Sequence, residues 1–169
     1  MTMYPSSAKP RRPLKAALKS IASIALCSVL LAGCSKPDYK TADGTTGDFK
    51  DLRGKWLVVN YWAEWCKPCI EELPELTAFQ REYENSVTVL TVNYDGALGD
   101  ALRQQIEKLR VELPVLLLDP AVQLGYKRPD ALPTTLIITP EGELKDTLIG
   151  PQTVATLAAA MGPTESPQP

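Results

Sequence analysis

Hydrophobic residues in the middle of the chain form short continuous runs that alternate with longer periodic stretches. Residues 56–62 (WLVVNYW) and 87–93 (VTVLTVN) are mostly apolar at successive positions, as expected for strands buried on both faces of a sheet. Residues 69–83 and 98–111 place apolar side chains three and four positions apart, the spacing of an amphipathic helix. A third short strand is expected at residues 114–118. This order predicts parallel strands joined by right-handed crossovers.

The second half of the predicted domain is expected to contain antiparallel rather than parallel strands. A short helical turn is expected at residues 121–125, and two apolar runs at 134–139 and 144–149 flank the turn PEGE at residues 140–143. A turn this short joins antiparallel strands. A last helix over residues 153–161 closes the domain. The predicted fold class is therefore α/β, with a central mixed β-sheet flanked by helices.

The start of the chain has a different pattern, in which a basic segment without acids precedes an apolar run at residues 21–31. This order is typical of a secretory signal peptide. The apolar run is too short to cross the roughly 30 Å core of a bilayer as a helix, so we expect export rather than a permanent transmembrane anchor. The basic residues are Lys9, Arg11, Arg12, Lys15 and Lys19.

Leu31-Ala-Gly-Cys34 follows the apolar run and resembles the lipobox of bacterial lipoproteins. That resemblance implies that residues 1–33 are removed and that Cys34 becomes a lipidated amino terminus, which holds the protein on a membrane of the bacterial envelope, facing the periplasm. Ser35 resembles the outer-membrane class of lipoproteins rather than the inner-membrane class. The alternative is an ordinary signal peptide with a chance cysteine behind it.

Polar segments flank the predicted core on both sides. Residues 34–47 contain many turn-forming residues and no apolar period, so we expect a lipidated tether. The segment PTESPQP at residues 163–169 is expected to be a flexible tail. Residues 48–162 then form one folded domain, in keeping with a chain of 169 residues that is 44% hydrophobic.

The charge balance argues against a nucleic-acid partner. Removing residues 1–33 takes away five of the 18 basic residues and none of the 20 acidic ones, which leaves a net charge of −7. Phosphate binding needs a basic stripe, and this composition does not offer one.

Four cysteines and no histidine limit the possible chemistry. Cys27 leaves with the signal peptide and Cys34 is acylated, so only Cys66 and Cys69 remain as thiols. No metal site is expected, because a structural zinc ion takes four ligands that are mostly Cys and His. A purely structural disulfide is disfavoured as well, since a bridge across so short a loop removes little entropy from the unfolded chain.

The position of the cysteine pair favours redox chemistry. The pair falls where a buried strand ends and a helix begins, and the free N–H groups and positive dipole end of a helix stabilise a thiolate. We expect Cys66 to be the nucleophile and Cys69, one turn into the helix, to resolve the mixed disulfide, with no cofactor beyond this redox-active disulfide. Pro68 is tolerated in a first turn. Lys67 either adds positive charge beside the thiolate or is an ordinary solvated lysine.

The sequence WAEWCKPC after a buried strand resembles thioredoxin-fold proteins. The longer pattern WCKPCIEELP, the export signal, the extra helix and strand after Asn93, and ALPTTLIITPEGEL are similar to the TlpA-like thiol-disulfide oxidoreductases of the bacterial envelope. The resemblance covers about residues 48–161. It implies a thioredoxin-like fold and an enzyme that exchanges its dithiol or disulfide with cysteines of a client protein.

The resemblance also implies roles for single residues. Pro133, preceded by Leu132, corresponds to a cis proline beside which the substrate docks; the alternative is a trans proline that opens a strand. Asn60 stands where thioredoxin has a buried aspartate, so it cannot accept a proton and should be hydrogen-bonded. Glu72 matches the glutamate of the CxxxExP pattern and either moves protons or faces solvent. Trp65 either contacts partners or packs inside the domain.

The resemblance favours the reducing direction, with electrons from a membrane thiol reductase and clients such as cytochrome c maturation factors. The dipeptide between the cysteines does not set the reduction potential. Two alternatives stay open: a protein disulfide oxidant or isomerase, and a binding lipoprotein whose cysteines are idle. A peroxidase is disfavoured because no Thr-x-x-Cys motif surrounds Cys66.

Overall fold

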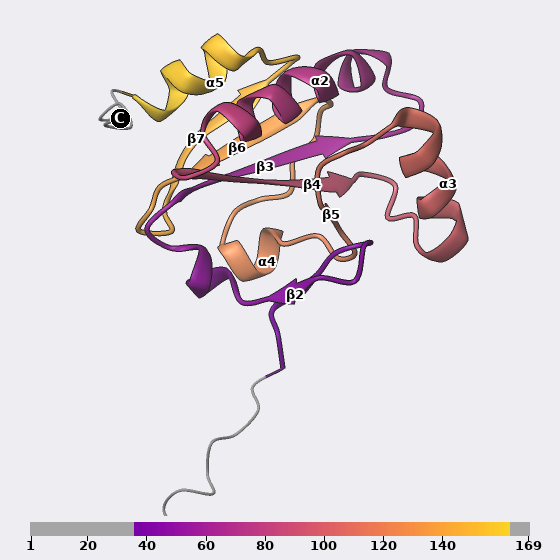
Figure 1. Ribbon diagram of the computed structural model, residues 1–169, viewed down its shortest axis with the longest axis horizontal. Helices are drawn as coiled ribbons and strands as arrows, with labels where there is room; N and C mark the ends of the chain where they lie inside the picture. The colour runs from indigo at the N-terminus through magenta and orange to yellow at the C-terminus, as the bar shows by residue number, and fades with distance from the viewer. Residues whose placement is uncertain (1–35, 163–169) are drawn as a thin grey trace, which may run out of the picture. The chain divides into compact units, whose positions relative to one another are not determined.

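A computed structural model describes residues 36–162 of the chain (Figure 1). The helices and strands follow the predicted order, with two additional short strands and a 3-10 helix at the start. In chain order they are β1 (Tyr39–Lys40), β2 (Thr46–Gly47), η2 (Phe49–Leu52), β3 (Trp56–Trp62), α2 (Lys67–Glu82), β4 (Val87–Asn93), α3 (Gly99–Leu109), β5 (Val115–Leu116), α4 (Ala121–Leu124), β6 (Thr134–Ile138), β7 (Leu144–Ile149) and α5 (Val154–Met161).

The central sheet has five strands in the order β5-β4-β3-β6-β7. β3 pairs with β4, and β4 with β5, in parallel, whereas β6 is antiparallel to both β3 and β7. The predicted mixed sheet is therefore confirmed, including the hairpin of β6 and β7. β3 lies in the middle, which explains why its sequence is apolar on both faces.

Two hydrophobic clusters cover the two faces of the sheet. Val58 and Trp62 of β3 point into the cluster that contains Leu76 of α2 and Leu157 of α5. Alternate β3 residues, among them Tyr61, point into the other cluster, which contains residues of α4 and η2. Figure 1 shows α2 and α5 on one side of the sheet and α4 on the other. This alternation is the two-residue period of a strand.

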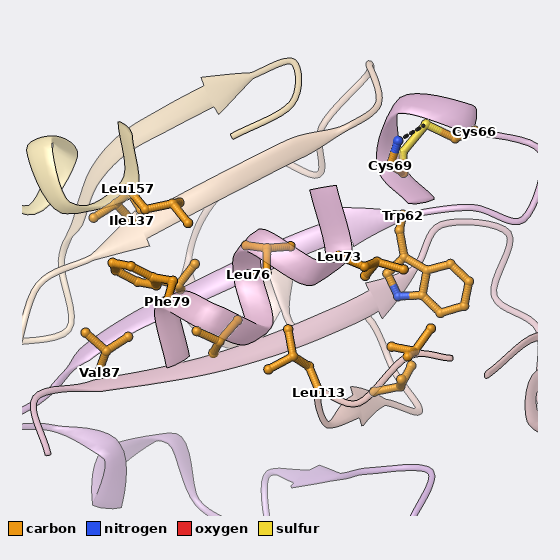
Figure 2. Packing of buried hydrophobic residues seen from close by; sticks show 14 of the residues in the cluster. Trp62, Cys66, Cys69, Leu73, Leu76, Phe79, Val87, Leu113, Ile137 and Leu157 are labelled. Atoms are coloured by element: carbon orange, nitrogen blue, oxygen red, sulfur yellow. Dashed lines mark hydrogen bonds between the residues drawn. A yellow bond between two sulfur atoms is a disulfide. The ribbon is translucent and has the colours of Figure 1, made fainter. Parts of the chain in front are cut away.

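Helix α2 is the element that carries the cysteine pair. It begins at Lys67, two residues earlier than the apolar period predicts, because Cys66 acts as its N-cap and Pro68 occupies the first turn, where a missing N–H costs nothing. The helix continues through Pro74 to Glu82. Its inner face packs on the sheet through a row of buried side chains that includes Leu73, Leu76 and Phe79 (Figure 2).

The prediction of an unpacked tether over residues 34–47 is wrong from residue 39 onward. β1 and β2 form an antiparallel hairpin, and the Ala42 N–H and Lys40 carbonyl bond to residues 115 and 117 at the edge of the sheet, at 2.8 and 2.9 Å. Thr41 is 1% exposed and bridges to Leu116. The side chains of this segment are polar, so its apolar pattern is weak, but its backbone completes an otherwise open strand edge.

The other predictions about the chain ends fall on residues that the structure does not describe. These are the signal peptide over residues 1–33, the lipidated Cys34 and the tail over residues 163–169. Between residues 36 and 162, none of the helices has both the length and the apolar character needed to span a membrane.

Candidate active site

Cys66 and Cys69 lie at the junction of β3 and α2 and are joined by a disulfide, with their Cα atoms 5.3 Å apart. Cys66 is 4% exposed and Cys69 is fully buried. Figure 2 shows the bridge at one end of the hydrophobic cluster, close to Trp62. Cys66 is thus nearly buried, but it is still the more exposed residue of the pair, which agrees with the prediction that it is the nucleophile.

The first turn of α2 supplies a hydrogen bond to the sulfur of Cys66. The Cys69 N–H donates to Cys66 Sγ over 3.3 Å, and Cys66 is the N-cap of a 16-residue helix. After reduction, this donor and the helix dipole favour a negative charge on the same atom. Lys67 lies next to the pair, but its side chain is 86% exposed and its Nζ lies 3.7 Å from Glu71 Oε1. It is therefore a solvated lysine that stabilises the thiolate little.

Pro133 is joined to Leu132 by a cis peptide bond, as predicted. It directly precedes β6, whose first residue, Thr134, is paired with Tyr61 of β3. Pro133 therefore lies at the same end of the sheet as the turn that leads into Cys66. Leu132 is half-buried and packs against both hydrophobic clusters.

Glu72 is buried, with 2% of its surface exposed, so the alternative of a solvent-facing helix residue is wrong. Its Oε1 accepts from Asn60 Nδ2 at 2.7 Å and its Oε2 from the backbone N–H of Gln152 at 2.8 Å. Burial raises the pKa of Glu72, and the hydrogen bonds from Gln152 and Asn60 offset part of that effect. A carboxyl group one turn after Cys69 is thus held closer to its neutral form than an exposed glutamate.

Asn60 is hydrogen-bonded, as predicted for a polar side chain in apolar surroundings. Besides Glu72, its Nδ2 donates to Thr135 Oγ1 of β6 at 2.9 Å, while its Oδ1 finds no donor among the described residues. The amide thus connects β3 to α2 and to the strand that follows Pro133. Its role here is to position these elements, since an amide does not take up a proton at neutral pH.

Trp65 is 67% exposed, so the alternative that it packs inside the domain is wrong. Its Nε1–H donates to the two carboxylate oxygens of Asp95, at 2.9 and 3.2 Å. The ring is therefore held in place beside Cys66 while its faces stay accessible. Sequence reasoning missed Asp95, because an aspartate in a loop after a strand carries no local signal of this contact.

A second group of residues that the sequence did not reveal supports the segment before Pro133. Tyr61 donates to Asp119 Oδ1 at 2.6 Å and lies 3.0 Å from the hydroxyl of Tyr126. Asp119 pairs with Arg128 Nε at 2.9 Å, and the Arg128 guanidinium lies 4.0 Å from the centroid of the Tyr94 ring. Burial raises the pKa of both Tyr61 and Tyr126 far above the usual range, so both hydroxyls stay neutral.

Metal ligation has no support within residues 36–162, which contain no group of three or more His, Cys, Asp or Glu side chains arranged to hold an ion. The chemistry that the arrangement offers is that of the two sulfurs themselves, with a buried carboxyl group and a cis proline nearby.

Comparison with known proteins agrees with this geometry. The model of the AhpC/TSA family matches residues 33–147. The chain belongs to the AhpC/TSA family. Among curated relatives, the thioredoxin-like protein YneN of Bacillus subtilis is 30% identical over 125 residues, which are 72% of this chain and 73% of YneN. The thiol-disulfide oxidoreductase ResA of Bacillus cereus is 28% identical over 124 residues, 72% of this chain and 71% of ResA.

Solved structures of other proteins have the same fold. StoA from Bacillus subtilis superposes with a TM-score of 0.60 at 25% identity, covering 72% of this chain and 92% of StoA. A thiol:disulfide interchange protein of the thioredoxin family from Chlorobium tepidum TLS, at 22% identity and a TM-score of 0.57, matches over 76% of this chain and 97% of its own, and shows the fold alone. The predicted thioredoxin-like fold and TlpA-like resemblance are thus confirmed, and the chain is a thiol-disulfide oxidoreductase that works through its own cysteines.

The burial of Glu72 predicts a pH-dependent stability. Between about pH 4.5, the ordinary pKa, and the raised pKa of the native state, the folded protein holds a proton that the unfolded chain has lost. The free energy of unfolding therefore falls as the pH rises through this window. Glu72→Gln cannot ionise, so the free energy of unfolding of this variant minus that of the wild type should increase over the same window.

Urea unfolding at a series of pH values measures this difference. Glu71→Gln, which changes an exposed glutamate one residue earlier in α2, is the matched control. Parallel stability curves for Glu72→Gln and the wild type between pH 4.5 and 8 would contradict the assigned effect of burial.

Proposed function

We propose that the protein is a lipid-anchored, periplasm-facing reductant that transfers electrons from a membrane thiol reductase to cysteines of client proteins. The main observation in its support is the asymmetry of the cysteine pair: Cys66 caps α2 and keeps the little exposure there is, while Cys69 is fully buried behind it. A structural bridge would not need this difference, but attack followed by resolution does.

The proposed reaction has two exchange steps. The Cys66 thiolate attacks one sulfur of a client disulfide, forms a Cys66–client disulfide and releases a client thiolate. The Cys69 thiolate then attacks Cys66 Sγ, which frees the second client thiolate and leaves the Cys66–Cys69 disulfide. Two electrons pass to the client, and each released thiolate takes up a proton. The membrane reductase restores the dithiol by the reverse exchange.

Glu72 is suited to take up the proton of the Cys69 thiol before the second step. It lies three residues after Cys69 on α2 and is buried, and its raised pKa makes its carboxylate a better base than an exposed one. Asn60 and the Gln152 N–H hold both carboxylate oxygens in place. Pro133 and Trp65 would contact the client backbone and side chains.

The anchoring part of the proposal rests on the Leu31-Ala-Gly-Cys34 motif. Labelling of cells with radioactive palmitate should mark the full chain and place it in the membrane fraction, whereas Cys34→Ala should be unlabelled and soluble in the periplasm. Cys27→Ala, which changes a cysteine before the cleavage site, is the control. Label retained in Cys34→Ala would refute the anchor.

Cysteine variants test the assignment of the two sulfurs. Cys69→Ser should accumulate Cys66–client disulfides, because the resolving thiol is missing, and Cys66→Ser should form none. The adducts are detected by non-reducing electrophoresis and mass spectrometry of the envelope fraction. Client engagement that survives Cys66→Ala undiminished would instead support the binding-module alternative.

The direction of electron flow is tested by the reduction potential of the Cys66–Cys69 pair, measured in graded glutathione or dithiothreitol buffers. As a reductant, the protein should have a potential near or below about −250 mV, close to that of thioredoxin. A potential near about −120 mV, the range of a strong disulfide donor, would support the oxidant alternative and reject the proposed direction.

A further inference from the structure

A hollow of about 520 Å³ lies at the carboxyl ends of β4 and β5, on the side of Trp65 where Asp95 holds the indole. Its walls are the loop of residues 94–97 after β4 and the segment of residues 117–122 that leads into α4. Carboxyl ends of parallel strands are a common place for binding sites in α/β proteins. The proposed exchange mechanism does not use this hollow.

Exposed large apolar side chains gather around the hollow. Leu118 and Val122 line it and are 70% and 91% exposed. Leu98 follows its lining residue Ala97, and Trp65 is bonded to its lining residue Asp95. These are four of the six large hydrophobic residues exposed within residues 36–162; the other two, Leu144 and Ile149, belong to β7. Apolar side chains clustered around a hollow mark an interaction surface more strongly than scattered ones.

One wall of the hollow is hydrogen-bonded to the segment that leads into the active site. The Tyr94 N–H donates to the carbonyl oxygen of Trp62 at 2.7 Å, and Trp65 donates to Asp95, so one wall of the hollow is bonded to the turn that leads into Cys66. A polypeptide whose disulfide reaches Cys66 passes Trp65, and a continuation of the same segment on this side enters the hollow.

The hollow is also preformed. Arg128 lines it and pairs with Asp119 while lying over the Tyr94 ring, which joins the two walls. A site whose walls are already fixed loses little conformational entropy when a ligand binds. Asp119 is neutralised by Arg128, whereas Asp95 is bonded to a neutral indole N–H and forms no ion pair with the described residues. The hollow therefore keeps one uncompensated negative charge next to its apolar rim.

We propose that this hollow binds an extended client segment that flanks the target cysteine and carries a large apolar side chain, with basic rather than acidic residues beside it. This inference rests on the proposed function, because it names a substrate class for the same site. Leu118 and Val122 would contact the apolar side chain, and Asp95 would attract the basic neighbour while it holds Trp65.

The test uses the full chain with Leu118→Ser and Val122→Ser combined. The matched control combines Leu144→Ser and Ile149→Ser, since Ile149 is 71% exposed and Leu118 70%, and both control positions lie on β7. The probes are two synthetic peptides with one internal disulfide, which differ only in a leucine or a serine beside the cysteine, and the small disulfide 5,5′-dithiobis(2-nitrobenzoate).

The wild type should reduce the leucine peptide with a kcat/KM about tenfold above that for the serine peptide, a difference of about 1.4 kcal/mol. The Leu118→Ser, Val122→Ser protein should lose this preference, whereas the β7 control should keep it. All three proteins should react with the small disulfide at rates within about twofold, because that reagent is too small to reach Cys66 and the hollow together. If the wild type reduces both peptides, equal rates for the two, or an equal loss in the β7 control, would overturn the proposal.

A binding measurement separates this proposal from the redox function. A leucine peptide with both cysteines replaced by serine is titrated into the oxidised protein while the methyl resonances of Leu118 and Val122 are followed by NMR. Saturable shifts support docking even if the wild type reduces no peptide, which would refute only the proposed function. The absence of shifts would overturn the docking proposal. Shifts that depend on the protein concentration rather than on the peptide would also overturn it, because they would reveal contact between two copies of the chain.

Discussion

The hydrogen bond between Asn60 and the buried carboxyl group of Glu72 is the contact on which the arrangement of the site depends. Through these two side chains β3, which leads to the cysteines, is tied to α2, which carries them. Asn60 also donates to Thr135 of β6, the strand that follows Pro133. Glu72 also accepts from the backbone N–H of Gln152, in the segment before α5. Removing one partner would leave a buried polar group unpaired, which costs more than the net value of the bond itself. The four elements are therefore held together where, in the proposed mechanism, a thiolate, a base and a docking backbone meet.

The junction of β3 and α2 gives the two sulfurs different properties. A strand buried on both faces ends inside the domain, so the helix that follows begins there too, with its free N–H groups directed at the first cysteine. Cys66 receives a hydrogen bond from the Cys69 N–H and keeps a small exposed area, while Cys69 has none. The reactive group is part of the chain, so the fold's contribution is to stabilise one thiolate and to shield the other sulfur.

Hydrogen bonds and an ion pair also fix the exposed side chains around the hollow next to Trp65. Asp95 fixes the orientation of an indole that would otherwise rotate freely, and Arg128 ties the loop after β4 to Asp119 on the opposite wall. Exposed apolar side chains on a rigid frame are better suited to recognise a segment of polypeptide than the same side chains on a mobile loop. Reactivity and client choice would then be set by neighbouring but separate groups of residues.

The sequence by itself determined the order and type of the main elements, because strand and helix periods are local properties, and it located the cysteine pair at a strand-to-helix junction. Resemblance to a known family added the cis peptide before Pro133. Neither the sequence nor the resemblance determined that Glu72 is buried, that Asp95 holds Trp65, or that residues 39–47 complete the edge of the sheet. Each of these features joins residues that are distant in the chain, through a polar side chain or a backbone group. The spacing of apolar residues does not reveal such contacts. A glutamate or threonine that hydrogen-bonds to water cannot be told from the sequence apart from one that hydrogen-bonds to another strand. Only the tertiary structure decided them, because only folding brings the partner within hydrogen-bond distance and removes the water that would otherwise take its place.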